Sequence, residues 1–133
     1  MIVVGASVLA DFVADDGPGG TRARQVVSEA REVSIPDVAD VETVAVLRKR
    51  LIGQTLTDNQ FAAAIDDLAS LPFRRYPSLP LLGRAYELRA TVTVYDAVYV
   101  ALAESLGCSL LTADARLARA SGPRCKIQVL SPE

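Results

Sequence analysis

Short apolar segments of strand length alternate along the chain with longer segments of helical periodicity. The strand-like segments are bounded by turn residues and are predicted at 2–4, 33–35, 73–76, 109–111 and 127–130. Between them, apolar positions recur at every third or fourth residue, which predicts helices at 7–13, 37–51, 79–89, 95–106 and 113–120, with two more starting at 21 and 57. This alternation is typical of an α/β fold. We therefore expect a three-layer α/β/α architecture around a mainly parallel sheet of about four to five strands.

Turn and capping residues indicate where several of these elements begin. Residues 15–20 have the Asp-Asp-Gly-Pro-Gly-Gly composition of a loop, so the second helix is expected to open at Thr21. Asp37 is placed to cap the third helix, and Thr57 opens the fourth. The fourth helix is expected to pack through three apolar side chains, Phe61, Ile65 and Leu68. Prolines flank the segment 73–76, which is therefore expected to be an edge strand.

The composition is that of a globular chain. With 133 residues, of which 50% are hydrophobic and 23% charged, we expect one domain over residues 1–133 with its own core. No basic segment precedes the first strand, and the longest apolar run, 97–103, is far too short to span a bilayer. The two cysteines, Cys108 and Cys125, form no C-x-x-C pair, so free thiols are expected. These features predict a cytoplasmic protein that does not enter the membrane.

The chain contains no histidine, which excludes His-based catalytic triads and His metal ligands. Any chemistry must then depend on carboxylates, hydroxyls, thiols or a bound metal. The formal net charge of −2 provides no general attraction to nucleic acid. RNA binding would therefore require local basic patches or bound cations.

Glu42 lies on an otherwise apolar helical stripe. Its neighbours at positions i−4, i+3 and i+4 are Val38, Ala45 and Val46. A carboxylate at such a position is costly to bury unless a cation or a metal compensates its charge, which makes Glu42 a candidate ligand. The alternative is a boundary position from which Glu42 reaches solvent or pairs with an arginine.

Two aspartates at expected helix starts are further candidates. Asp96 is the only charged residue in the apolar segment 92–103, which should form a central helix. Asp114 follows the strand at 109–111 and begins the next helix. Capping offers an alternative explanation for both, because Thr93 and Asp96 have capping-box spacing and acids are favourable in a first helical turn.

The three acids are expected to meet at one crevice, because Asp114 follows a strand's carboxyl end and Glu42 can face the same edge from its helix. In open α/β sheets, ligands bind at that edge. Clustered carboxylates repel one another and stay ionised only when cations hold them. Oxygen ligands without histidine or thiolate indicate Mg²⁺ or Mn²⁺. Because such ions can polarise a phosphodiester and generate hydroxide, the set predicts a metal-dependent nuclease.

Four segments resemble, in the right order, the motifs of PIN-domain toxin ribonucleases of the VapC type. Residues 1–7 read MIVVGAS and resemble the family's opening strand, which is followed by Asp-Ala-Ser. Residues 36–42, PDVADVE, resemble the segment that carries the family's glutamate. Residues 93–104, TVYDAVYVALAE, and 110–117, LLTADARL, are similar to the third and fourth motifs. The resemblance covers essentially the whole chain.

The resemblance implies an endoribonuclease that cleaves RNA with Mg²⁺ or Mn²⁺. It also implies a homodimer and a cognate VapB-type antitoxin whose tail enters the acidic site. By position, it assigns the metal ligands to Glu42, Asp96 and Asp114. Ser7 and Thr112 would be supporting hydroxyls. Arg116 is a candidate for phosphate contact, with an ordinary solvent-exposed helix arginine as the alternative.

Gly5 departs from the family pattern, because it stands where the first aspartate is expected. Glycine offers no side-chain oxygen ligand, so we expect this chain to be severely impaired or inactive while its fold survives. The alternative interpretation of Gly5 is a turn glycine after a strand.

Other function classes receive less support from the sequence. No Gly-Lys-Ser/Thr follows the glycines at 17–20, and no G-x-G-x-x-G follows the first strand, so nucleotide loops are not indicated. A receiver-like domain would need a well-placed lysine, and only Lys49 and Lys126 are present. The main rival is a catalytically dead module that binds its antitoxin and acts in regulation.

Two groups of surface candidates stay open. The basic runs 48–50 and 74–75 are candidates for contact with an RNA backbone, although solvated helix faces or antitoxin contacts explain them as well. Six apolar positions are candidates for an antitoxin groove or a dimer seam, with core packing as the alternative: Val8, Leu9, Phe12, Leu47, Leu51 and Phe61.

Overall fold

The computed structural model describes residues 1–130, and the last three residues of the expected domain, 131–133, lie outside that range. Within the described residues, five parallel strands form one sheet in the order β3-β2-β1-β4-β5. The strands are β1 (Ile2–Val4), β2 (Val33–Pro36), β3 (Arg74–Tyr76), β4 (Ser109–Thr112) and β5 (Ile127–Val129). The predicted α/β fold with a mainly parallel sheet is therefore confirmed.

The apolar content of each strand matches its place in the sheet. β1 is the central strand, and Ile2 pairs with Val33 of β2 on one side and with Ser109 of β4 on the other. All residues of β1 and β2 are buried, as expected for parallel strands covered on both faces. β3 and β5 are more exposed and lie at the two edges, which confirms the edge strand predicted at 73–76.

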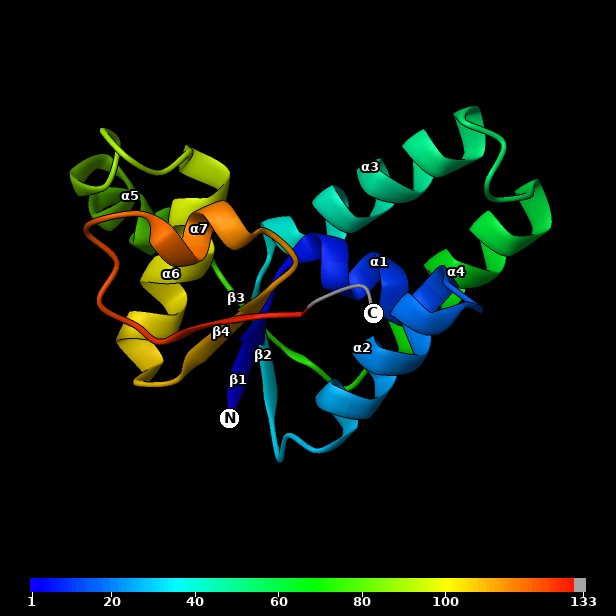
Figure 1. Ribbon diagram of the computed structural model, residues 1–133, viewed down its shortest axis with the longest axis horizontal. Helices are drawn as coiled ribbons and strands as arrows, with labels where there is room; N and C mark the ends of the chain where they lie inside the picture. The colour runs from blue at the N-terminus through cyan, green and yellow to red at the C-terminus, as the bar shows by residue number, and fades with distance from the viewer. Residues whose placement is uncertain (131–133) are drawn as a thin grey trace.

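Helices cover both faces of the sheet, as Figure 1 shows. The short helix α5, the long α6 and the short α7 lie on one side, whereas α1 and α2 lie on the other and the α3–α4 pair projects beyond them (Figure 1). The helices are α1 (Ala6–Ala14), α2 (Pro18–Ser28), α3 (Val38–Ile52), α4 (Asp58–Ser70), α5 (Leu82–Glu87), α6 (Val94–Leu106) and α7 (Ala115–Arg119), with a 3₁₀ turn η1 (Leu79–Leu81) before α5. No helix within residues 1–130 is both long and apolar enough to cross a bilayer.

Helix α6 forms the centre of one helical layer, as its apolar sequence predicts. Every residue from Ala97 to Ala103 is buried, and the helix packs against β1, β2 and β4. The Thr93 hydroxyl accepts a hydrogen bond from the Asp96 backbone N–H at 3.2 Å, which caps the first turn. Gly107 ends the helix in the left-handed conformation, with φ at 67°. The caps set where α6 begins and ends, and its packing holds the helix against the sheet.

The start of α2 differs from the prediction. The helix begins at Pro18, so residues 18–20 of the predicted loop are helical and Thr21 lies inside the first turn. The Asp15 carboxylate accepts hydrogen bonds from the backbone N–H groups of Gly17 and Gly20, at 2.8 and 3.1 Å. It thereby satisfies donors that a first helical turn leaves unpaired, and proline is well tolerated at that position.

Three further local expectations have different outcomes. Asp37 stands at the first position before α3 but does not cap it, because its carboxylate accepts hydrogen bonds from the Ser78 backbone N–H and hydroxyl. Thr57 caps α4 in a complete capping box with Gln60, as expected. Ile65 was expected to pack inside, but 38% of its surface is exposed.

Candidate active site

Six of the residues singled out in the sequence line one hollow of about 340 Å³. It opens at the carboxyl ends of β1 and β4, the edge at which ligands bind in open α/β sheets. The six residues are Gly5, Ser7, Glu42, Asp96, Thr112 and Asp114. The site is therefore assembled from four separate parts of the chain. Arg116, which the sequence analysis also singled out, does not line this hollow.

The order of the elements explains why these side chains meet. Gly5 directly follows β1 and precedes α1, and Thr112 is the last residue of β4. Asp96 lies in the first turn of α6, whose N-terminus reaches the same edge of the sheet. Glu42 lies on α3, in the turn after its start at Val38.

Asp114 has a structural role in addition to lining the hollow. Its Oδ1 accepts a hydrogen bond from the Arg116 backbone N–H at 2.9 Å and so caps α7. The Arg116 guanidinium donates to the same oxygen at 3.3 Å. These hydrogen bonds, led by the one from the backbone, hold the pKa of Asp114 below its ordinary value. Asp114 therefore remains ionised and keeps its second oxygen, Oδ2, for another partner.

Glu42 and Asp96 are half-buried, and their ionised forms are disfavoured. Burial raises the pKa of Glu42, the nearby charge of Asp96 raises it further, and a hydrogen bond from the Tyr99 hydroxyl opposes the shift. Burial also raises the pKa of Asp96, with the charge of Asp114 adding to the effect while Thr93 and Arg116 oppose it. Negative charge in this hollow is therefore only partly compensated by the chain's own groups. Such a site attracts cations.

The donor set suits a hard divalent cation in its chemistry but not in its spacing. Carboxylates and hydroxyls line the hollow, and these are the oxygen donors that Mg²⁺ and Mn²⁺ prefer. Within residues 1–130, however, no three acidic side chains lie close enough together to hold a metal ion.

Gly5 lines the same hollow and contributes no side-chain oxygen to it. Its backbone is extended, with φ at −75° and ψ at 159°, which any residue can adopt. A Cβ atom added there would lie 3.4 Å from the Leu111 carbonyl oxygen and 3.9 Å from the Thr112 hydroxyl, both ordinary contacts. Nothing in the local geometry therefore requires glycine, and the turn-glycine interpretation is not supported. The backbone and the space at this position accept a Cβ atom.

Tyr99 also lines the hollow, although the sequence analysis did not single it out. Its hydroxyl donates a hydrogen bond to Glu42 Oε1 at 2.9 Å, and only 4% of the residue is exposed. An aromatic residue in an apolar helix is normally core, which is why Tyr99 gave no signal. Its spacing of three residues from Asp96 places both on one side of α6. A buried tyrosine hydroxyl requires a hydrogen-bond partner, and that requirement was the available clue.

A second hollow of about 260 Å³ adjoins the first. Asp96 and Asp114 line both hollows, so these two carboxylates stand between them. The second hollow is also lined by Thr91, Thr93 and Arg116. The Arg116 side chain is 86% exposed, so its guanidinium remains available beyond the contact with Asp114.

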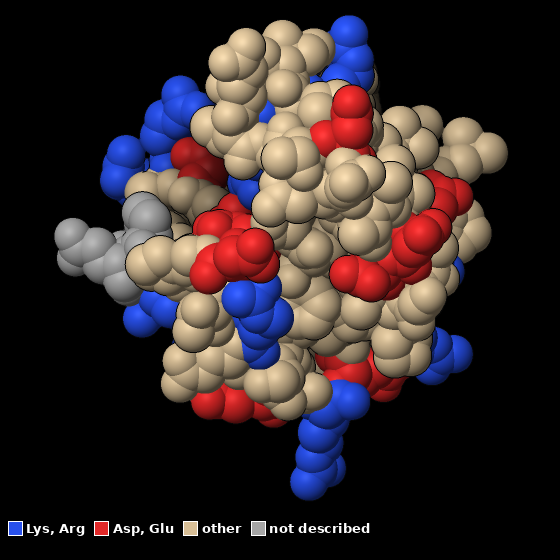
Figure 2. Space-filling model, turned by 90° about the vertical axis from the view of Figure 1, so that its right-hand side faces the viewer, with Lys and Arg blue, Asp and Glu red and all other residues tan. Residues whose placement is uncertain are grey.

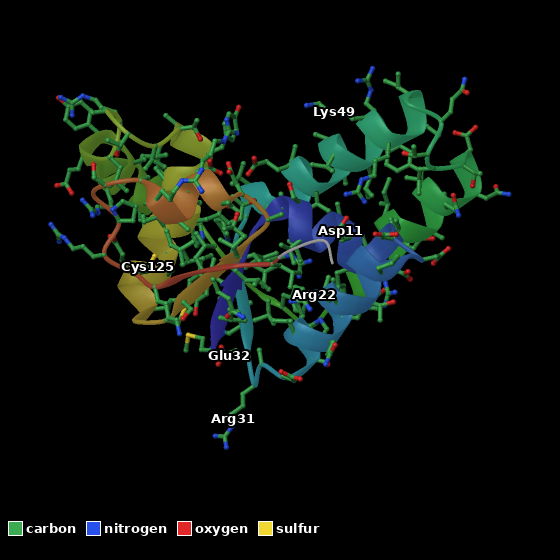
Figure 3. The ribbon with its side chains drawn as sticks, in the orientation of Figure 1. Asp11, Arg22, Arg31, Glu32, Lys49 and Cys125 are labelled. Atoms are coloured by element: carbon green, nitrogen blue, oxygen red, sulfur yellow. The ribbon has the colours of Figure 1, made fainter. Side chains whose placement is uncertain are left out.

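The basic runs do not form one continuous cationic surface. Arg50 pairs with Asp11 at 2.6 Å, Arg74 with Glu32 at 3.3 Å and Arg75 with Asp40 at 2.7 Å. Lys49 and Arg31 point away from the body at different ends of the molecule (Figure 3). On the face that Figure 2 turns toward the viewer, acidic and basic groups are interspersed on a mostly uncharged surface. Attraction of a polyanion therefore depends on local contacts or on bound cations.

An apolar groove lies apart from the acids. It occupies about 590 Å³ and is lined by Val41, Val44, Ile65, Leu68 and Ala69, with the Asp40–Arg75 ion pair at its border. None of the six apolar positions considered in the sequence analysis lines it. Val8, Leu9 and Leu47 among those six are fully buried core residues.

Comparison with known proteins identifies the family. The PIN domain family matches residues 2–123. Ribonuclease VapC12 of Mycobacterium tuberculosis is 37% identical over 131 residues, which cover 98% of this chain and 100% of that protein. Ribonuclease VapC1 of the same organism is 37% identical over 129 residues, 96% of each chain. A solved toxin–antitoxin complex from Klebsiella pneumoniae shares the fold, with a TM-score of 0.69 at 15% identity over 100% of this chain and 98% of that one. The chain therefore belongs to the PIN-domain family.

Proposed function

We propose that this chain is a VapC-type endoribonuclease toxin that uses Mg²⁺, or Mn²⁺ in its place, to cleave RNA. The observation that carries the proposal is the meeting of Glu42, Asp96 and Asp114 with Gly5 in one hollow at the strand ends. The relatives at 37% identity are named ribonucleases, which supports the same activity here. The half-buried, mutually repelling acids supply the negative charge that would hold the ion.

The residues around the hollow have separate proposed roles. A bound Mg²⁺ would polarise the phosphodiester and lower the pKa of an attacking water. Glu42, Asp96 and Asp114 would hold the ion. Thr112 supports this arrangement, because its hydroxyl accepts a hydrogen bond from the Asp114 backbone N–H at 3.1 Å and fixes the turn that presents Asp114. Ser7, at the start of α1, would supply a second supporting hydroxyl.

Arg116 is proposed to contact the substrate. Its exposed guanidinium borders the hollow that adjoins the acids, where it would meet a phosphate next to the one being cleaved. Replacing Arg116 with glutamine should raise KM for RNA. Metal affinity is measured alongside, because the Arg116 guanidinium also donates a hydrogen bond to Asp114 Oδ1.

Gly5 is proposed to leave the activity of this chain severely impaired. With glycine there, one oxygen donor is missing from the set, and the remaining acids are too far apart to hold an ion among themselves. A metal typically contributes several kcal/mol to such a reaction, and each ~1.4 kcal/mol is a tenfold change in rate. The loss relative to a form with aspartate is expected to be at least about a hundredfold.

The test is RNA cleavage with Mg²⁺ and with Mn²⁺ by this chain and by its Gly5→Asp variant. Gly5→Asn is the matched control, because asparagine has the shape of aspartate without the charge. Gly5→Asp combined with Asp96→Asn checks that any cleavage comes from this site. Cleavage by Gly5→Asp alone supports both the nuclease and the disabling effect of Gly5. Equal cleavage by the chain as it stands would show that three acids suffice and that Gly5 does not disable the enzyme.

An antitoxin partner and a homodimer complete the proposal. The solved Klebsiella structure of the same fold is a toxin–antitoxin complex, which supports a partner of that kind. The apolar groove between α3 and α4 offers an uncharged surface for an antitoxin segment. Five large apolar side chains are exposed along η1, α5 and the start of α6, and they are candidates for the dimer surface: Leu79, Leu82, Tyr86, Val94 and Tyr95.

The second candidate function is a binding module without catalysis, and Gly5 is the observation that favours it. Such a module would capture its VapB-type antitoxin as tightly as the Gly5→Asp variant does, yet neither form would cleave RNA. Pull-down of the antitoxin by both forms, measured beside the cleavage assay, separates the two functions. Light scattering of the purified chain determines whether it is a dimer.

A further inference from the structure

Tyr99 connects two of the elements that carry the acidic hollow. It lies on α6 three residues after Asp96, and its hydroxyl reaches across to Glu42 on α3. The O–H donates to Glu42 Oε1 at 2.9 Å, a good hydrogen-bond distance. One helix therefore supplies one acid, Asp96, directly and holds a second acid, Glu42, through Tyr99.

The hydrogen bond restricts how Glu42 can turn. Within the described residues, Tyr99 is the only group that donates a hydrogen bond to the Glu42 carboxylate. With Oε1 held by the hydroxyl, the carboxylate is restricted in its orientation and Oε2 is left for another partner. A glutamate side chain has three rotatable bonds, so an unheld carboxylate would sample several orientations at an entropic cost to any ligand.

A neutral donor suits this position better than a cationic one. An arginine or lysine would orient Glu42 equally well, but its positive charge would cancel the negative charge that attracts a metal ion. The tyrosine hydroxyl orients the carboxylate and leaves its charge in place. Burial and the neighbouring carboxylates also raise the pKa of Tyr99 far above its ordinary value, so the hydroxyl remains a donor throughout the physiological range.

Simple core packing does not account for the hydroxyl. Phenylalanine would fill the same buried space without introducing a polar atom. A tyrosine at a site that is 96% buried must satisfy its O–H, and here it does so on a residue of the acidic hollow.

We propose that Tyr99 is a positioning residue that fixes the Glu42 carboxylate through its hydroxyl, so that Oε2 is oriented to bind a divalent metal ion. The inference rests on the proposed nuclease function, because it assigns Tyr99 a role in that same site. Outer-shell partners of this kind typically contribute 10- to 100-fold to metal affinity. Tyr99→Phe should therefore weaken metal binding by about 10- to 100-fold.

The experiment uses the full-length Gly5→Asp protein as the parent. Mn²⁺ affinity is measured by the electron paramagnetic resonance signal of the free ion, for the parent and for the Tyr99→Phe, Glu42→Gln and double variants in that background. Tyr76→Phe is the matched control, because Tyr76 of β3 is partly buried against the core and lies outside the hollow. Thermal unfolding of the metal-free proteins reports any purely structural effect.

The expected result is weaker Mn²⁺ binding in Tyr99→Phe, parental binding in Tyr76→Phe, and no further loss when Tyr99→Phe is added to Glu42→Gln. That non-additivity identifies Glu42 as the group through which Tyr99 acts. RNA cleavage by Tyr99→Phe should show a lower kcat at low Mn²⁺ with an unchanged KM for RNA, and high Mn²⁺ should restore kcat.

Three outcomes would overturn the inference. Mn²⁺ affinity within twofold of the parent in Tyr99→Phe, with or without a lower melting temperature, would leave Tyr99 a core residue. Additive losses in the double variant would show that Tyr99 does not act through Glu42. If the Gly5→Asp parent itself bound no Mn²⁺, the proposed function would fail and the inference with it, an outcome that the parent measurement alone distinguishes from the other two.

Discussion

Restoring an aspartate at position 5 should destabilise the metal-free protein, and the size of the effect can be worked from the structure. The steric contribution is small, because the backbone at Gly5 has an ordinary φ of −75° and the added Cβ meets no atom closer than 3.4 Å. The electrostatic contribution is larger. The new carboxylate enters a hollow where Glu42 and Asp96 already have raised pKa values.

Each like-charge pair at roughly 6 Å costs about 2–3 kcal/mol at an effective dielectric constant of 20. Replacing glycine offsets about 0.4–1 kcal/mol of this, because the unfolded chain loses freedom. Counting one such pair, the net loss of about 2 kcal/mol at pH 7 is a lower bound and corresponds to a fall of roughly 6–10 °C or more in Tm for a chain of this size. An acid whose pKa is raised in the folded state destabilises the protein only above its unfolded pKa, so the loss should disappear as the pH falls below about 4.

The assay is thermal unfolding at low ionic strength, with Gly5→Asn as the uncharged control. At pH 7 without metal, Gly5→Asp should melt below Gly5→Asn, and the two should converge at low pH. Mn²⁺ at a hundred times its Kd should return about 2.7 kcal/mol to Gly5→Asp and little to the control. Equal melting temperatures at pH 7, together with no response to Mn²⁺, would refute the placement of position 5 in a shared acidic cluster.

Three further predictions concern stability away from the acids. Burial opposes the charge of Glu104, but hydrogen bonds led by Arg84 outweigh it and lower the pKa of Glu104. Glu104→Gln should therefore lower the free energy of unfolding by about 1.5–3 kcal/mol in urea at pH 7. This difference should shrink as the pH falls below 4.5, because the parent carboxylate becomes protonated. Gly20→Ala should destabilise by more than about 2 kcal/mol, because its Cβ would clash with the Asp15 carbonyl oxygen. Gly83→Ala, in α5 with nothing within 4 Å of an added Cβ, should instead stabilise by about 0.5–1 kcal/mol in the same assay, and a loss there would contradict the helix assignment.

Those features of the fold that depend on local patterns were predicted well from the sequence. The buried strands β1, β2 and β4 lie within one residue of their expected bounds, because a short apolar run between turn residues is a local signal. The gathering of Asp96 and Asp114 could also be foreseen, because both follow from where strands end and helices begin.

The predictions that failed, or could not be made, depend on hydrogen bonds between residues far apart in the sequence, or on a side chain outside a helix that bonds to its first turn. The Asp37 carboxylate was expected to cap its own helix, but it binds Ser78, which is 41 positions away. The contact between Tyr99 and Glu42 spans 57 positions, so no local periodicity could indicate it. The early start of α2 depends on one side chain, Asp15, that satisfies two backbone donors from outside the helix.

The central place of β1 in the sheet also determines when the site can exist. β1 is the first strand to be synthesised, but its partner β4 begins only at Ser109, so one edge of β1 stays unpaired until most of the chain has been made. Pairings so distant in sequence slow folding. Gly5 and Glu42 come from the first third of the chain, whereas Asp96 and Asp114 come from the last. A nascent chain, or a fragment cut anywhere between these two parts, therefore contains only half of the acidic hollow.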